Sequence, residues 1–152
     1  LQGVTNELLK LIPSFRERPD RLLVCATNFI RSLDSAFLRH GRFDYVIPIG
    51  LPDVEARTAI WTRFIPTAAA TAVDLEAVVA ASAGFTPADM EFAARRASQA
   101  ALEAAVGGGR GQGDDAGPTT ADYLAAISST RATVSEAEAG DFAEDIEAFG
   151  RI

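Results

Sequence analysis

The spacing of apolar positions divides the chain into a front part with extended segments and a longer helical part. Apolar residues recur at helical spacing from Val4 to Ile12, whereas residues 22–26 form a short continuous apolar run between polar neighbours. The first pattern predicts a helix, and the second predicts a strand buried on both faces, as in a parallel sheet. Residues 45–49 predict a second strand, in which Pro48 indicates a sheet edge or a strand end. Two strands cannot make a stable parallel sheet, so we expect only part of a larger α/β domain.

From residue 53 onward the pattern is helical, and each expected helix has a capping residue at its start. A Ser, Thr or Asp side chain at this position accepts a backbone N–H that the helix itself leaves unpaired. We therefore expect a small helical domain at residues 53–152, which follows an α/β remnant of two strands at residues 1–52. The start signals are Asp53, Asp74, Thr86 with Pro87, Thr119, and the capping box of Ser135 and Glu138.

The glycine-rich residues 107–117 predict a flexible surface loop. A phosphate-binding loop is also rich in glycine, but it needs two glycines spaced around four residues, then Lys and Ser or Thr, between a strand and a helix. No lysine follows this loop and no predicted strand precedes it. Lys10, the only lysine of the chain, has no glycine loop before it. Neither segment therefore matches a phosphate-binding loop.

The net charge and the single cysteine indicate which binding partners and which cellular compartment to expect. The 152 residues carry a formal net charge of −7, which argues against broad charge-driven binding of nucleic acid or anionic membranes. No apolar stretch approaches the roughly 20 residues that a membrane-spanning helix needs. The single cysteine, Cys25, lies in the apolar run of residues 22–26, where we expect a small buried hydrophobe in a reducing, cytoplasmic setting. Because the chain begins without Met, inside an apolar-patterned segment, we expect a piece of a longer protein.

Three stretches of the front part resemble the second region of homology of the AAA ATPases. They are residues 23–28 (LVCATN), 33–44 (LDSAFLRHGRFD) and 49–53 (IGLPD), and residues 84–89 (GFTPAD) are similar to a helix start in the family's lid. The family includes the valosin-containing protein, katanin, spastin, the proteasomal ATPases and the NSF-type fusion ATPases. Apart from the glycine-rich loop, the resemblance covers nearly the whole chain. It implies the C-terminal part of an AAA module, in which the end of the α/β nucleotide-binding subdomain precedes an all-α lid.

By this resemblance, Asn28 would be the family's first sensor. Its carboxamide follows the carboxyl end of a predicted buried strand, where open α/β sheets bind ligands, and it would hold the attacking water against the γ-phosphate. The plainer alternative is an asparagine that caps a turn.

Arg39 and Arg42 resemble the family's paired arginine fingers, which reach from one subunit into the ATP site of its neighbour. A guanidinium suits this role because it is always charged and offers a planar fork of donors. The alternative is two solvated arginines beside a turn at Gly41. His40 replaces a residue that is commonly Pro in the family, and we give it no catalytic role. The acidic residues of this stretch are expected to cap or brace it: Asp34 and Asp44.

The resemblance also implies how the lid would hold the nucleotide. Ile60 and Phe64 would lie against the base and ribose, and Pro87 with Ala88 would contact the nucleotide near its phosphates. The alternative is an ordinary helix core, which we prefer for Trp61. Two departures from the family pattern weaken this assignment, because Pro87 stands where many members have Gly and Phe64 where some have His.

The implied function of the parent protein is ATP hydrolysis by a ring, a hexamer, that remodels or unfolds protein substrates with ATP and Mg²⁺ as cofactors. The family's Walker A and Walker B motifs and its pore loop would precede residue 1, so we expect the fragment alone to be inactive and to hold no metal. One alternative is a degenerate AAA scaffold without hydrolysis, which would not need Asn28, Arg39 and Arg42. Another is a DNA-acting loader, against which the acidic charge and the Pro-Ala lid pattern argue.

Overall fold

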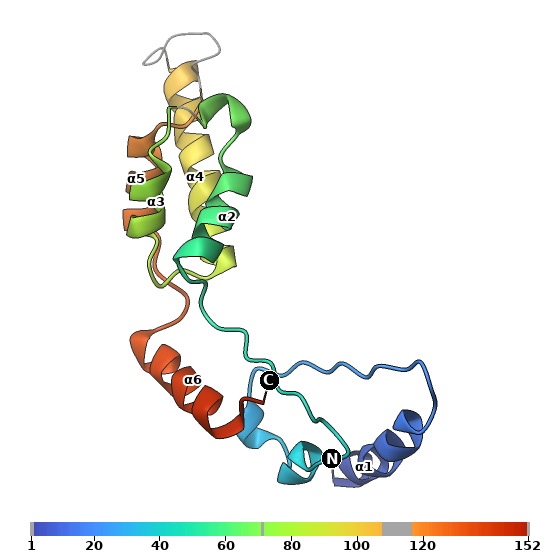
Figure 1. The fold of residues 1–152 in the computed structure, drawn as a ribbon. Helices are drawn as coiled ribbons and strands as arrows, with labels where there is room; N and C mark the ends of the chain where they lie inside the picture. The colour runs from blue at the N-terminus through green and yellow to red at the C-terminus, as the bar shows by residue number, and fades with distance from the viewer. Residues whose placement is uncertain (1, 71, 108–116, 152) are drawn as a thin grey trace. The chain divides into compact units, whose positions relative to one another are not determined.

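The computed structural model describes residues 2–70, 72–107 and 117–151, and over these residues the chain forms helices joined by extended segments, with no strand (Figure 1). The residues fall into two compact units. The first unit comprises Leu1–Ile49 with Gly140–Ile152, and the second comprises Gly50–Ala139. Of the predicted glycine-rich loop, residues 108–116 lie outside the described residues.

The second unit is helical, and its helices begin at the predicted caps. The Asp53 carboxylate accepts the N–H of Ala56, and the Asp74 carboxylate accepts the N–H of Ala77. Capping boxes at Thr86 and Thr119 begin the two later helices. The helices are α2 (Val54–Phe64), α3 (Leu75–Ala81), α4 (Pro87–Val106) and α5 (Thr120–Ser129), with the short 3-10 helix η3 (Thr67–Ala69) between the first two.

The core of this unit is centred on Trp61, which is fully buried. The Tyr123 ring meets it edge-on, with ring centroids 5.8 Å apart, and the indole Nε1–H donates to Ser82 Oγ at 2.8 Å. Ala93 and Ala97 on α4 are also fully buried, and such small side chains allow neighbouring helices to approach closely. The predicted core role of Trp61 is therefore confirmed.

The first unit contains α1 (Gln2–Arg16), the 3-10 helices η1 (Ile30–Ser32) and η2 (Ser35–Leu38), and most of α6 (Glu136–Phe149). The helix expected over residues 4–12 continues past Pro13 to Arg16. The capping box predicted at Ser135 begins α6, since Ser135 Oγ accepts the N–H of Glu138 and the Glu138 carboxylate accepts the N–H of Ser135. The backbone N–H of Ser135, and also its hydroxyl, donate to the Glu138 carboxylate, and these two hydrogen bonds lower the pKa of that carboxyl below its ordinary value.

The two predicted strands are wrong for the described chain. Residues 22–26 run as extended chain without a partner strand, and the side chains of Leu22 and Val24 are 85% and 77% exposed. Residues 45–49 form one isolated antiparallel bridge, between Val46 and Arg151. An apolar strand is buried only when neighbouring strands and helices cover its two faces, and the described residues supply neither. For the same reason Cys25, expected to be buried, is exposed.

Candidate functional site

The predicted arginine fingers lie on residues 34–44, which we name the finger segment. Asp34 caps η2 by accepting the N–H of Ala36 at 2.8 Å, and the Asp44 carboxylate accepts the N–H of Gly41 at 2.9 Å. Gly41 has a φ of +88°, a left-handed conformation that glycine adopts without strain. Asp44 also forms an ion pair of 2.7 Å with Arg16 of α1. The expected bracing roles of Asp34 and Asp44, and the turn at Gly41, are confirmed.

Arg39 and Arg42 lie three residues apart, but their guanidinium groups have different surroundings. Arg42 is half-buried, and its Nη1 donates to the carbonyl oxygen of Ala36 at 2.5 Å. The side chain of Arg39 is exposed, while its backbone N–H donates to the same Ala36 oxygen at 3.4 Å. The turn therefore holds one arginine against its own backbone and presents the other to solvent.

Asn28 is exposed and lies at the end of the extended residues 22–28. The next residue, Phe29, donates its backbone N–H to Thr27 Oγ1 at 3.1 Å, so a local turn follows this segment. Within the described residues, Asn28 shares no hydrogen bond with the finger segment. The structure thus brings Arg39 and Arg42 onto one turn and leaves Asn28 outside it.

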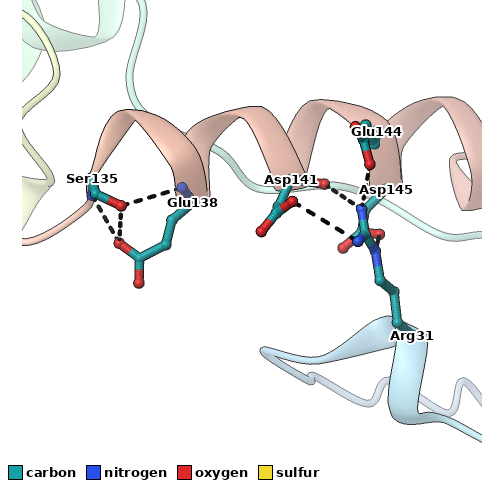
Figure 2. A network of polar contacts seen from close by, with 6 residues as sticks. All are labelled: Arg31, Ser135, Glu138, Asp141, Glu144 and Asp145. Atoms are coloured by element: carbon teal, nitrogen blue, oxygen red, sulfur yellow. Dashed lines mark hydrogen bonds and ion pairs between the residues drawn. The ribbon is translucent and has the colours of Figure 1, made fainter.

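Helix α6 is attached to the residues around the finger segment by Arg31 of η1 (Figure 2). The Arg31 Nη2 donates to the Glu144 carboxylate at 3.1 Å and to the backbone oxygen of Asp141 at 3.0 Å, and the Nε donates to the Asp145 carboxylate. The hydrogen bond to Asp145 is the main reason that the pKa of the Arg31 guanidinium is raised above its ordinary value. Three carboxylates on successive turns of α6 therefore surround one arginine.

Arg151, two residues beyond the end of α6, contacts the finger segment and the chain that follows it. Arg151 and Val46 exchange backbone hydrogen bonds of 3.0 and 3.1 Å, and the Arg151 Nη1 donates to the carbonyl oxygen of Leu38 at 2.6 Å. Arg39, His40, Phe149 and Arg151 line a shallow hollow at this place. His40 is exposed.

The predicted lid residues lie in the second unit. Ile60 and Phe64 are half-buried and pack against the core around Trp61, so one side of each remains open to solvent. Pro87 is the first residue of α4, and Pro87 and Ala88 are both exposed in its first turn. Ile60 and Phe64 therefore lie on α2 at the border of the core, and Pro87 with Ala88 lies at the N-terminus of α4.

Asp89 fixes the start of α4 to the chain that follows α5. Its buried carboxylate accepts the backbone N–H of Thr86 at 2.9 Å and of Thr133 at 3.2 Å, and it also accepts both threonine hydroxyls. Burial alone would raise the pKa of Asp89, but the hydrogen bonds from Thr133 and Thr86 outweigh it and lower the pKa below its ordinary value. Because these donors favour the ionised form, Asp89 is a buried, satisfied carboxylate.

The contacts of three residues were not predicted from the sequence: Asp89, Arg31 and Arg151. The Thr86–Asp89 pair has the spacing of a capping box, so that signal was available. The partners of Arg31 and Arg151 lie more than 100 positions away along the chain, and no local pattern marks them.

Comparison with known proteins identifies the family to which the chain is related. Residues 1–51 match the family model "ATPase family associated with various cellular activities (AAA)". The crystal structure of the FIGL-1 AAA domain superposes with a TM-score of 0.76 at 27% identity, over 95% of this chain and 50% of that chain. The chain belongs to the AAA ATPase family. Its fold is that of an AAA-domain fragment with a helical lid.

Further AAA proteins match parts of the chain. The ATP-dependent zinc metalloprotease FtsH 4 of Sphaerobacter thermophilus is 43% identical over 103 residues, which are 66% of this chain and 15% of the relative. The Cell division cycle protein 48 homolog of Archaeoglobus fulgidus is 39% identical over 102 residues, 65% of this chain and 14% of the relative. The FIGL-1 AAA domain in complex with ADP covers 99% of this chain, with a TM-score of 0.75 at 26% identity, and 53% of that chain is matched. The chain thus spans about one seventh of these curated relatives.

No described helix is long and apolar enough to cross a membrane. Among the same residues, no group of three or more His, Cys, Asp or Glu side chains could hold a metal ion.

Proposed function

We propose that this chain is the C-terminal part of an ATP-hydrolysing AAA ring ATPase that remodels or unfolds protein substrates. In this proposal the chain contributes the sensor Asn28, the arginine fingers and the helical lid. The family membership supports ATP hydrolysis by the parent protein. The finer roles rest on the geometry of the finger segment and of the lid.

The observation that carries the proposal is the exposed guanidinium of Arg39 on a braced turn. Asp34, Asp44 and Gly41 fix the backbone of the finger segment, and Arg39 extends from it into solvent. A permanently charged planar group on a rigid base is what stabilises the charge of a transferred γ-phosphoryl group. Because Arg39 is exposed and the chain holds no phosphate-binding loop, the ATP that Arg39 would meet is proposed to belong to a neighbouring subunit. With the ring assembly that is usual in the family, we propose a ring, a hexamer, for the complete protein.

The lid would also contact the nucleotide. Ile60 and Phe64 leave part of their surface uncovered, which suits contact with a base and ribose. Pro87 and Ala88 lie at the N-terminus of α4, where the helix dipole favours negative charge such as phosphate. The FIGL-1 AAA domain was crystallised in complex with ADP, and this likeness supports nucleotide binding by the complete protein. Mg²⁺ and the phosphate-binding loop would be supplied by parts of the parent outside these 152 residues.

The names of several relatives support a protein substrate, since FtsH 4 and the YME1L1 of Mus musculus are both called ATP-dependent zinc metalloproteases. From these names we take only that the substrate is a protein. We also propose that the complete protein acts in the cytoplasm. No zinc site and no protease activity is part of the proposal.

The experiment compares the complete protein with the isolated 152-residue chain under the same conditions. Release of phosphate from Mg-ATP and binding of a fluorescent ADP analogue are measured for both. We expect turnover only from the complete protein and none from the isolated chain. If the complete protein assembles but shows no turnover, it is a scaffold without hydrolysis, and the proposal fails. Turnover that needs DNA would instead favour a DNA-acting loader.

A further inference from the structure

We propose that Arg151, beyond the end of α6, is a positioning residue for the arginine finger Arg39. This inference rests on the proposed function, because it assigns Arg151 a role through Arg39. The motif that indicated the fingers ends at residue 53, so it does not include Arg151.

The contact acts on the peptide unit from which Arg39 begins. A peptide bond is planar, so the Leu38 carbonyl and the Arg39 N–H move together as one rigid group. The Arg151 Nη1 donates to the Leu38 oxygen at 2.6 Å, and the Arg39 N–H donates to Ala36 at 3.4 Å. The first of these bonds is charge-assisted and shorter than the second, so it contributes more to holding the plane. Arg151 thereby fixes the direction in which the Arg39 side chain leaves the backbone.

Arg151 itself is held by its backbone and not by its guanidinium. It exchanges two backbone hydrogen bonds with Val46, and the preceding Gly150 donates its N–H to Ile146 at 2.8 Å. A Cβ atom at Gly150 would lie 2.6 Å from the Ile146 carbonyl oxygen, so a side chain there would displace the turn. Further back on α6, Arg31 binds Asp141, Glu144 and Asp145 (Figure 2). Truncation of the Arg151 side chain therefore removes the bond to Leu38 and leaves the anchoring bonds in place.

The expected consequence is a loss of rate without a loss of nucleotide binding. A displacement of a catalytic group by about 1 Å can lower the rate on the order of 100-fold. For Arg151→Ala in the complete protein we expect kcat to fall about 10- to 100-fold with KM within about twofold, and with the ring intact. For Arg151→Lys, which can still donate to Leu38, we expect recovery of most of this rate. The matched control is Arg18→Ala, since Arg18 is an exposed arginine of the same unit whose side chain forms no hydrogen bond or ion pair among the described residues.

Mixed rings separate positioning from a general structural defect. Subunits with Arg39→Ala lack the finger that they offer to a neighbour, whereas subunits with Asn28→Ala lack a group in their own ATP site. Mixing these two variants recreates some intact sites and restores activity. If Arg151 acts through Arg39, Arg151→Ala subunits regain activity when mixed with Asn28→Ala subunits and gain none when mixed with Arg39→Ala subunits.

Three results would overturn the inference: unchanged turnover in Arg151→Ala, loss of the ring in this variant, or restored activity on mixing it with Arg39→Ala. A different result identifies failure of the proposed function instead. If Arg39→Ala and Asn28→Ala each keep full turnover, neither residue has its proposed role, and the positioning role of Arg151 falls with them.

Discussion

Arg42 donates a hydrogen bond from its guanidinium to the carbonyl oxygen of Ala36, and this bond closes the turn that carries Arg39. Arg42 is half-buried, whereas Arg39 is exposed. Although both arginines belong to one motif, the structure gives Arg42 a contact that supports the turn and leaves the Arg39 guanidinium available to a partner.

The first prediction separates the two arginines by stability. Loss of a hydrogen bond that involves a charged group costs about 1.5–3 kcal/mol, so we expect Arg42→Ala to speed amide exchange of residues 36–43 by at least about tenfold. Arg39→Ala removes an exposed side chain, and exchange should stay within about twofold of the wild type. Hydrogen–deuterium exchange with mass spectrometry of the 152-residue chain measures both. Equal effects of the two substitutions would contradict the assignment of Arg42 to the turn.

The second prediction concerns the buried hydroxyl of Tyr123, which has no hydrogen-bond partner among the described residues. Burial of an unpaired hydroxyl costs about 1–3 kcal/mol, so we expect Tyr123→Phe to leave the stability of the helical unit unchanged or to raise it by about 1 kcal/mol. The matched change, Trp61→Phe, removes the hydrogen bond to Ser82 and should lower it by about 1–3 kcal/mol. Urea unfolding followed by circular dichroism tests the pair. A loss of more than about 1 kcal/mol in Tyr123→Phe would mean that the hydroxyl is bonded.

The third prediction is a pH dependence from Asp89. Its folded pKa is below the ordinary 3.8, because hydrogen bonds from Thr133 and Thr86 outweigh the effect of burial. A carboxyl whose pKa is lower in the folded state stabilises the fold at any pH above its pKa in the unfolded chain. This stabilisation is lost as the pH falls below 3.8 and through the folded pKa. We expect Asp89→Asn to cost about 1–2 kcal/mol near pH 7, with the difference from wild type shrinking below about pH 4.

The fluorescence of Trp61, the single tryptophan, reports unfolding of this unit during urea titrations at each pH. A second variant, Thr133→Val, keeps the carboxylate but removes one hydroxyl donor, and it should show a smaller change of the same sign. A stability difference for Asp89→Asn that stays constant down to about pH 3 would contradict the account.

The fourth prediction is self-association of the isolated chain. Leu22, Val24, Ile47 and Ile49 are all more than two thirds exposed on extended segments, and unpaired extended chain with apolar side chains favours edge-to-edge pairing. We expect light scattering at high concentration to show species larger than a monomer. Val24→Lys should reduce association without a loss of helix content, since Val24 is already exposed. A monodisperse monomer of the wild-type chain would refute this prediction.

The sequence predicted the helical unit well because its signals are local. The caps at Asp53, Asp74, Thr86 and Thr119 act within three residues of themselves, and all four are present in the structure. The same holds for the bracing of the finger segment by Asp34 and Asp44.

The prediction of strands at residues 22–26 and 45–49 was wrong because burial of a strand depends on distant partners. An apolar run favours burial between other elements, and the described residues provide no neighbouring strand that could bury it. Distance along the chain also explains why the contacts of Arg31 and Arg151 were missed. The roles in nucleotide chemistry stay predictions for all seven residues: Asn28, Arg39, Arg42, Ile60, Phe64, Pro87 and Ala88.

The most direct test of the central claim is ATP turnover by the complete protein, wild type beside Arg39→Ala, with subunit number and ADP binding measured on the same samples. Removal of an arginine finger costs about 10³- to 10⁵-fold in rate in related phosphoryl-transfer enzymes. The account predicts that the variant loses turnover by at least about 100-fold while it still forms the ring and binds nucleotide. A ring of Arg39→Ala subunits that hydrolyses ATP at the wild-type rate would contradict the claim.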